Sequence, residues 1–295
     1  MRASIGSSAT ARWDRGTHLS PDVSLDDIPQ SVLEEVRLGI QHYFVPLLVI
    51  SPEHPKHPVD LAGSGTLVEL AGKHYILTAD HVWNRTDGWA EIGLALEAAG
   101  GAPLAIPIDR ISPKRLVDSA YSEWGPDLAL LELPPHLVPT IGARKSFLNL
   151  ARRRSMLTSH PPQMEKALWV VMGLVGQSSE VKASADTGVV VANLRAEAFF
   201  GVTCQENCCN GCDYLTIYAK TTLPGVPSSF KGVSGGGLWQ VALKMMAGAI
   251  VWRGEHHFRG VAFWQEPEPP DHISIRCHGP RSIFEKAWDA WGLTR

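Results

Sequence analysis

Short apolar runs rich in β-branched residues recur along this sequence from Phe44 onward, and Gly, Pro or charged residues separate them. The runs are FVPLLVIS, SGTLVEL, KHYILTA, LAIPI and DLALLEL, followed by LWVVMGLV, TGVVVANL, YLTIYAK, GGLWQV, GAIVW and RGVAFWQ. Runs of this length and composition are typical of strands rather than helices. We therefore predict an all-β protein whose strands close into barrels, because closure hides the sheet edges.

Two segments with helical spacing flank the strand region. The first segment has apolar residues at four-residue steps, namely Ile28, Val32, Val36 and Ile40. The same spacing recurs near the C-terminus in Ile283, Ala287 and Trp291, and Gly292 follows. These patterns predict one amphipathic helix before the strands and another after them.

The length of 295 residues suggests two structural units, since domains average about 150 residues. We expect residues 1–28 to form a flexible arm, because they have no apolar period. Residues 29–150 would hold the first helix and the first β-barrel, and 151–280 a linker and the second barrel. Residues 281–295 would form the C-terminal helix. Prolines bound the segment 134–166, which is the expected linker region.

The charge balance excludes a protein that gathers polyanions over its whole surface. The chain has 27 Lys and Arg residues against 30 Asp and Glu residues, for a net charge of −3. The basic run Arg152–Arg154 is expected to be a solvated part of the linker, and it would neutralise too few phosphates to hold nucleic acid. We therefore expect no nucleic-acid partner.

No segment of the sequence has the composition of a membrane anchor or a secretory signal. The N-terminal residues lack an apolar run of about 7–15 residues, and the stretches 43–50 and 245–252 fall far short of the roughly 20 residues that a membrane span needs. Five cysteines, four of them between Cys204 and Cys212, make a poor disulfide framework. We expect no membrane partner and a reducing, cytoplasmic setting.

The cysteine cluster leaves one alternative open. Its pattern is Cys204-x3-Cys208-Cys209-x2-Cys212, and thiolate tetrads are common zinc sites, but this spacing is not the usual paired C-x2-C. We expect no metal and no cofactor. Zinc is the alternative to free thiols or an oxidisable pair on a hairpin of the second barrel.

Three short motifs place different reactive side chains beside suitable backbone. Ala79-Asp80-His81 follows an expected strand and offers an imidazole at its end. Asp127 leads directly into the apolar run LALLEL, where an unpaired charge would be costly. Ser234 lies within Gly232–Gly237, whose glycines allow tight turns and let backbone N–H groups face a ligand. Each motif alone is weak, but their order along the chain is informative.

Together the motifs resemble those of the trypsin-like, or chymotrypsin-fold, serine proteases, whose catalytic residues occur in the order His, Asp, Ser. Here His81 and Asp127 are 46 positions apart and Asp127 and Ser234 are 107 apart. The resemblance covers roughly residues 40–292. It implies two six-stranded antiparallel β-barrels, with His81 and Asp127 in the first, Ser234 in the second, and the active site between them.

The resemblance also implies a role for each residue. Ser234 would attack a carbonyl carbon, His81 would accept the serine proton, and Asp127 would hold the imidazole in the useful tautomer. The backbone N–H groups of Gly232 and Ser234 would form the oxyanion hole.

Departures from the family pattern limit the specificity and the activation that can be carried over. Val233 stands where many secreted relatives have the Asp that pairs with a newly cleaved N-terminus, so that switch is not expected. Ser228 would lie at the base of the P1 pocket without a charge for Arg or Lys. The strand around Phe263 and Trp264 would bind the substrate backbone, and a bulky residue where relatives often have Gly favours a small or medium apolar P1 side chain.

We therefore expect a serine endopeptidase of the bacterial intracellular type, acting on protein or peptide substrates through His81, Asp127 and Ser234. An intracellular protease must be restrained, which leaves room for a regulatory protein partner and a role as a triggered effector. The alternative is a catalytically silent trypsin-fold module that binds a protein or peptide.

Overall fold

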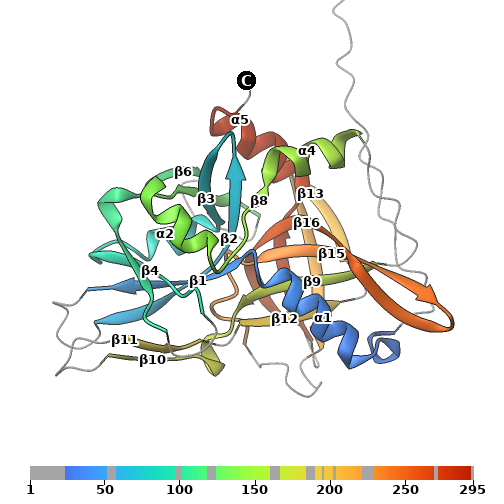
Figure 1. Cartoon of the computed structure of the whole chain (residues 1–295). Coiled ribbons are helices and arrows are strands. Elements are labelled where there is room, and N and C mark those ends of the chain that lie inside the picture. The colour runs from blue at the N-terminus through green and yellow to red at the C-terminus, as the bar shows by residue number, and fades with distance from the viewer. Residues whose placement is uncertain are drawn as a thin grey trace, which may run out of the picture.

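The computed structural model describes residues 24–51, 58–97, 101–117, 124–159, 167–183, 190–194, 196–201, 204–220, 229–268 and 272–293. Two antiparallel sheets make up most of this part of the chain (Figure 1). Within the described ranges, no helix is long and apolar enough to cross a membrane. Ser228 and residues 1–23 of the expected arm lie outside the described residues.

The first sheet contains strands from residues 44–149. They are β1 (Phe44–Ile50), β2 (Val59–Leu70), β3 (Lys73–Thr78), β4 (Glu91–Leu94), β5 (Leu104–Pro107), β6 (Ser112–Val117), β7 (Asp127–Glu132) and β8 (Leu148–Asn149). Their order is β5-β4-β1-β2-β3-β7-β6, and the short β8 pairs with β2 in parallel. Every other pairing in this sheet is antiparallel.

The second sheet contains strands from residues 167–278. They are β9 (Ala167–Leu174), β12 (Ala196–Gly201), β13 (Cys204–Cys209), β14 (Cys212–Lys220), β15 (Gly237–Met246), β16 (Ala249–Glu268) and β17 (His272–His278). Their order is β12-β9-β15-β16-β17-β14-β13. A separate hairpin pairs β10 (Glu180–Ala183) with β11 (Val190–Asn193). The runs GAIVW and RGVAFWQ belong to the single long strand β16.

The two sheets share one cyclic strand order. In the first sheet the six main strands are β1, β2, β3, β4, β6 and β7, and in the second they are β9, β12, β14, β15, β16 and β17. Numbered one to six within each sheet, they follow the circle 1-2-3-6-5-4. The first circle is open between its fourth and fifth strands and the second between its second and third, although β12 and β14 are in contact there. The all-β, two-barrel expectation is confirmed.

Helical segments lie before, between and after the strands. They are η1 (Leu25–Asp27), α1 (Gln30–Ile40), α2 (Asp80–Asn84), η2 (Ile108–Arg110), η3 (Pro135–Leu137), α3 (Val138–Gly142), α4 (Leu150–Ser159), η4 (Gly176–Ser178), η5 (Ser282–Ala287, a π-helix) and α5 (Trp288–Ala290). Both expected helices are confirmed. Helix α1 buries Val32, Val36 and Ile40, and the C-terminal segment buries the three apolar residues that predicted it.

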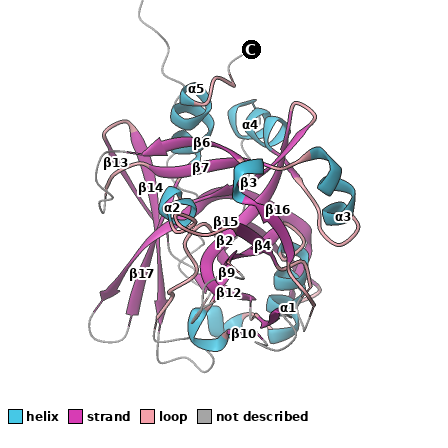
Figure 2. Ribbon diagram, turned by 90° about the vertical axis from the view of Figure 1, so that its left-hand side faces the viewer, coloured by secondary structure: helices cyan, strands magenta, loops and turns pink. Residues whose placement is uncertain are grey.

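Helix α4 lies in the expected linker region and corrects the prediction for its basic run. Arg152 is exposed, but Arg153 contacts His257 Nδ1 at 2.9 Å. Arg154 donates to the carbonyl oxygen of Phe284 at 3.0 Å and lies 4.7 Å from the centre of the Trp288 ring. Two of the three arginines therefore attach α4 to the second unit, because a guanidinium group can stack on an indole while it donates hydrogen bonds. Figure 2 shows α4 and α5 together at one end of the molecule and α1 toward the other.

Alternation along the strands divides the core into the interiors of the two sheets and a shared layer between them. In β7, Leu128 belongs to the shared cluster and Ala129 to the interior of the first sheet. In β9, Val170 belongs to the shared cluster and Val171 to the interior of the second sheet. Successive side chains on a strand point to opposite faces, so both sheets are buried on two sides. The shared layer holds the two sheets against each other.

Candidate active site

The pair formed by His81 and Asp127 lies at the ends of two adjacent strands. His81 follows β3 on the short helix α2, and Asp127 is the first residue of β7. The strands β3 and β7 pair antiparallel, with Thr78 opposite Ala129. The last residue of β3 and the first residues of β7 therefore lie side by side, which brings His81 and Asp127 to the same end of these two strands.

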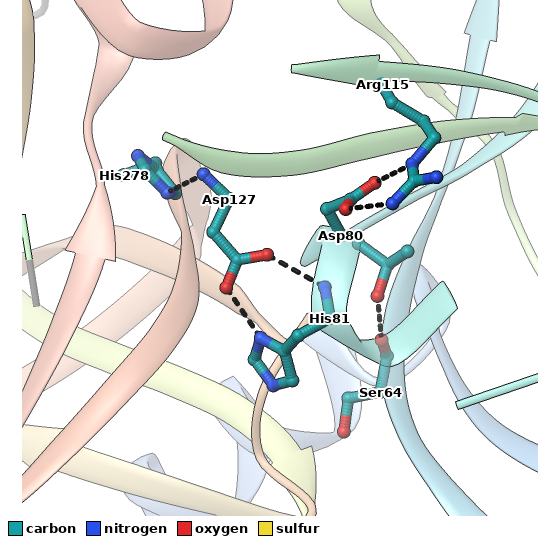
Figure 3. A network of polar contacts seen from close by, with 7 residues as sticks. Ser64, Asp80, His81, Arg115, Asp127 and His278 are labelled. Carbon is teal, nitrogen blue, oxygen red and sulfur yellow. Dashed lines mark hydrogen bonds and ion pairs between the residues drawn. The ribbon is translucent and has the colours of Figure 1, made fainter. Parts of the chain in front are cut away.

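The Asp127 carboxylate binds His81 at two points (Figure 3). Asp127 Oδ2 lies 2.5 Å from His81 Nδ1, and Asp127 Oδ1 accepts a hydrogen bond from the His81 backbone N–H at 2.8 Å. An ionised carboxylate can only accept, so Nδ1 is the donor in this contact, and in the neutral ring Nε2 carries the lone pair. Only 5% of the Asp127 side chain is exposed, against 31% for His81. The imidazole is thus oriented from a buried anchor, while about a third of its side chain is exposed.

His278 lies behind Asp127 and comes from the second sheet. Its Nε2 accepts a hydrogen bond from the Asp127 backbone N–H at 3.1 Å, and its ring stacks on Phe263 with the ring centres 4.1 Å apart. The side chain is fully buried, and burial lowers the pKa of His278 to about 3. His278 is therefore neutral near pH 7 and can serve as an acceptor. No motif pointed to it, although the alternating run HISIRCH could have identified its strand.

Arg115 and Asp80 brace the helix that carries His81. Asp80 is fully buried, and Arg115 on β6 donates to its two oxygens from Nε at 2.6 Å and from Nη2 at 2.7 Å. Arg115 Nη2 also donates to Asn84 Oδ1 at 2.7 Å. The bidentate pair with Asp80 and the hydrogen bond to Asn84 together attach both ends of α2 to β6. The sequence offered no signal for Arg115, because β6 reads as a polar segment.

The loop around Ser234 has a backbone that requires glycine at two places. Gly232 has φ +100° and Gly235 has φ +86°, in the left-handed region that L-residues avoid. A Cβ at Gly235 would also collide with the carbonyl oxygen of Ser64 and with Thr78 Oγ1. The glycines that flank Ser234 thus allow the loop to pack directly on β2 and on the end of β3.

Hydrogen bonds to carbonyl groups orient the two N–H groups predicted for the oxyanion hole. The carbonyl of Lys231 accepts from Gly176 N–H at 2.9 Å, and that of Val233 accepts from Gly236 N–H at 2.8 Å. In a trans peptide the N–H points opposite to the C=O, so Gly232 N–H and Ser234 N–H are directed away from these partners. Neither donates a hydrogen bond within the part of the chain that the structure describes. Gly232 and Ser234 are both half-buried.

The Ser234 carbonyl and the side chain of Val82 both lie close to Gly63. Ser64 N–H donates to the carbonyl oxygen of Ser234 at 2.9 Å. A Cβ built on Gly63 would lie 2.9 Å from that same oxygen and 2.8 Å from Val82 Cγ2, and Val82 directly follows His81. The loop that carries Ser234 thus packs on β2 of the first sheet, close to the helix that carries His81.

A small cavity adjoins Ser234 among the residues expected to bind substrate. Its volume is about 10 Å³, room for roughly one water molecule. The residues that line it are Phe230, Val233, Ser234, Ala262, Phe263, Trp264, Gln265 and Ile275. Gln265 Oε1 accepts from Phe230 N–H at 2.8 Å and joins two walls of this cavity. Phe263 is buried and Trp264 half-buried.

The cysteine tetrad that zinc would need does not form. Cys204 and Cys209 are the two ends of β13, five residues apart and hence separated by about 17 Å. Cys208 and Cys209 are consecutive and point to opposite faces, while Cys209 lies opposite Cys212 across the hairpin. Among the described residues, no three His, Cys, Asp or Glu side chains converge on a metal-sized site. Burial also raises the pKa of Cys204 to about 12, which keeps it a thiol.

Comparison with known protein families finds no model that matches this sequence, and comparison with curated proteins finds no match. Among solved structures, the Drosophila Grass clip serine protease of the Toll pathway is 13% identical, with a TM-score of 0.46 over 95% of this chain and 75% of that one. The thermostable serine protease AL20 from an extremophilic microorganism is 12% identical, with a TM-score of 0.44 over 87% and 100%.

A third structure comes from work on the coupled folding and binding of the intrinsically disordered Sesbania mosaic virus VPg protein. It is 14% identical, with a TM-score of 0.38 over 86% of this chain and 96% of that one. Likenesses this distant leave activity to be argued from the site itself.

Proposed function

We propose that this protein is a serine endopeptidase that cleaves peptide bonds through Ser234, His81 and Asp127. The observation that carries the proposal is the pair of hydrogen bonds between Asp127 and His81, which engages Nδ1 and leaves Nε2 as the nitrogen that would accept the serine proton. The packing of the Ser234 loop beside Val82 supports a contact between Ser234 Oγ and that nitrogen. A base and a hydroxyl so arranged can carry out acyl transfer.

The chemistry follows in two halves. Ser234 Oγ bonds to the carbonyl carbon as its proton passes to His81 Nε2, and the carbonyl electrons move onto oxygen. The C–N bond then breaks, the proton goes to the leaving amine, and an acyl-enzyme remains. Water repeats the sequence: its oxygen bonds to the carbonyl carbon, His81 takes its proton and returns it to Ser234 Oγ, and the acid product leaves.

Charge on the tetrahedral oxygen would be held by the N–H groups of Gly232 and Ser234. Both lack an acceptor within the described residues, and both are oriented by hydrogen bonds to the carbonyl group of their own peptide unit. Preorganised donors of this kind contribute about 3–4 kcal/mol each in comparable enzymes.

The substrate is a protein or peptide with a small or medium apolar P1 side chain. The small cavity beside Ser234 and the bulk of Phe263 and Trp264 support this preference. Ser228, proposed for the base of the P1 pocket, contributes no charge for a basic side chain.

A cytoplasmic setting of the bacterial type is part of the proposal. All five cysteines lie in the described ranges, and none of them forms a disulfide. Inside a cell the activity of a protease must be kept in check. The proposal therefore includes a regulatory protein partner and a role as a triggered effector.

The rival function is a catalytically silent module that binds a peptide. It would need neither the His81 tautomer set by Asp127 nor two N–H groups kept without an acceptor inside the described chain. A module of this kind would bind a peptide and leave it uncut.

The decisive experiment is reaction of the purified protein with a fluorophosphonate, followed by mass spectrometry of its peptides. We expect one adduct, on Ser234, and loss of both labelling and peptide hydrolysis in Ser234→Ala. A matched control is Ser229→Ala, which removes a hydroxyl in the same loop and should keep both. Labelling of another residue, or hydrolysis by Ser234→Ala, would overturn the proposal.

A further inference from the structure

Ser64 on β2 is a fully buried serine whose polar groups all bind parts of the site. Its Oγ donates to the carbonyl oxygen of Gly232 at 2.7 Å and accepts from Leu174 N–H at 2.8 Å. Its backbone N–H donates to the Ser234 carbonyl at 2.9 Å. Its own carbonyl accepts from Thr78 Oγ1 at 2.7 Å. Figure 3 shows Ser64 below the helix that carries His81.

The bond from Ser64 Oγ holds the one peptide unit that lies between the two predicted oxyanion donors. Gly232 N–H belongs to the unit that begins at Lys231, and Ser234 N–H to the unit that begins at Val233. The unit between them carries the Gly232 carbonyl, and its rotation would change the angle between the two donors. Gly232 has no side chain to limit that rotation and sits at φ +100°.

The other end of this middle unit, Val233 N–H, donates to the Phe230 carbonyl oxygen at 3.0 Å, which is a contact within the loop itself. Gly176 and Gly236 hold the carbonyls of Lys231 and Val233, one on each side of the middle unit. Among the described residues, only Ser64 reaches the middle carbonyl from the first sheet, and through Leu174 N–H it is itself fixed to the end of β9. The hydroxyl therefore joins the first sheet, β9 and the loop at one buried point.

We propose that Ser64 is a positioning residue for the oxyanion hole, which aligns Gly232 N–H and Ser234 N–H for the same oxygen. The proposal rests on the proposed protease function and adds a dependence of the second sheet's loop on a side chain of the first sheet. Ser64 touches neither substrate nor reacting atoms. Its effect should appear where negative charge develops on oxygen and not in binding of the uncleaved substrate.

The test compares Ser64→Ala with the wild-type protein on a peptide substrate and with a peptide boronic acid. Boron bonded to Ser234 Oγ becomes tetrahedral and places an oxygen at the oxyanion position. In Ser64→Ala we expect kcat to fall by about 10–100-fold and KM to change by less than about twofold. Affinity for the boronic acid should fall by about the same factor as kcat.

Ser282→Ala is the matched control. Ser282 is also fully buried, and its hydroxyl donates to the Asp213 carbonyl at 2.7 Å and accepts from Asp213 N–H at 2.9 Å. Loss of this hydroxyl should lower the melting temperature without changing the ratio of boronic acid affinity to KM. Ser64→Cys, which keeps a weaker donor of similar size, should restore part of kcat.

The outcomes separate this inference from the proposed function. If the wild-type protein neither cleaves peptides nor forms the Ser234 adduct, the protease proposal fails first. If it does both and folded Ser64→Ala keeps wild-type kcat and boronic acid affinity, the positioning role is wrong and the protease remains. Failure of both Ser64 variants to fold would also overturn it, because Ser64 would then serve the whole fold and not the hole.

Discussion

The two halves of the candidate site are held by different parts of the polypeptide. In the first sheet, side chains orient side chains: Asp127 binds His81, and Arg115 binds Asp80. In the second sheet, the loop around Ser234 is held through carbonyl groups and close backbone packing. Substitutions in the first half should therefore alter chemistry while the fold survives. In the second half, added atoms should disturb the structure itself.

Asp127→Asn should have the largest effect on turnover. An asparagine amide would donate to His81 Nδ1, which shifts the imidazole proton to Nε2 and removes the base. We expect kcat to fall by on the order of 10⁴, with the melting temperature nearly unchanged. Steady-state kinetics and thermal melts of the two proteins check this.

An unchanged rate would mean that another carboxylate orients His81. The sequence offers Asp109 and Asp118 as candidates. Asp109 is exposed and lies 4.0 Å from Arg110 Nε, while Asp118 is outside the described residues. Asp109→Asn should leave kcat unaltered and serves as the control.

Gly235→Ala should disturb the second half through its backbone. The residue has φ +86°, and its Cβ would collide with the Ser64 carbonyl and Thr78 Oγ1. Strain and overpacking together should lower the free energy of unfolding by about 2–5 kcal/mol, and activity should be lost with it. Urea denaturation and peptide cleavage measure both.

Gly248→Ala isolates the strain from the collision. Gly248 has φ +82°, but nothing lies within 4 Å of a Cβ placed there. Gly248→Ala should lower the free energy of unfolding by only about 1 kcal/mol and should keep full activity. Equal losses in the two variants would contradict the packing account of the loop.

His278 links the two halves, and its burial makes stability depend on pH. Its pKa in the folded protein is about 3, below the ordinary histidine pKa of 6.5, so the unfolded chain binds more protons between these values. Stability is therefore fully present above about pH 6.5 and falls as the pH decreases toward 3. Between pH 7 and pH 5 this group should cost about 2 kcal/mol of unfolding free energy.

The comparison protein for this prediction is His278→Leu, measured by urea denaturation at pH 7 and pH 5. On acidification from pH 7 to pH 5, the free energy of unfolding of this variant should fall by about 2 kcal/mol less than that of the wild type. Burial also lowers the pKa values of His256 and His257, but both proteins share these groups and the difference cancels them. Identical pH dependence would mean that His278 takes up a proton in the folded state.

The smallest effect should come from the N-terminus. Val233 is 2% exposed within an apolar cluster, and Gly173 packs against it, so a buried α-ammonium group would have no carboxylate there. A chain shortened to begin at Ser24, which keeps Ile28 in the core, and one with an N-terminal fusion should both match the full chain in kcat/KM within about threefold. A hundredfold gain on shortening would identify a pro-segment.

Most strands could be predicted from the sequence, and so could the closeness of His81 and Asp127, which the structure joins by a hydrogen bond. Apolar runs mark strands wherever both faces are buried, as in β1 and β9. Strands with polar residues escaped notice: β6 reads SPKRLV, with every residue of it exposed or half-buried, and β17 carries Arg and His on the face away from its apolar residues. Local pattern predicts a strand only where burial selects one kind of residue.

What holds the reactive residues in position could only be learned from the tertiary structure. Ser64 and Leu174 are 110 positions apart, and Asp127 and His278 are 151 apart. Neither Ser64 nor His278 belongs to a motif, because their function depends on which backbone group of a distant segment faces them. Hydrogen bonds act over about 3 Å, so such partners meet only after both sheets have closed and packed on their shared layer. The chain alone specifies the chemistry that is available, and the packing of the two sheets decides which peptide groups it can use.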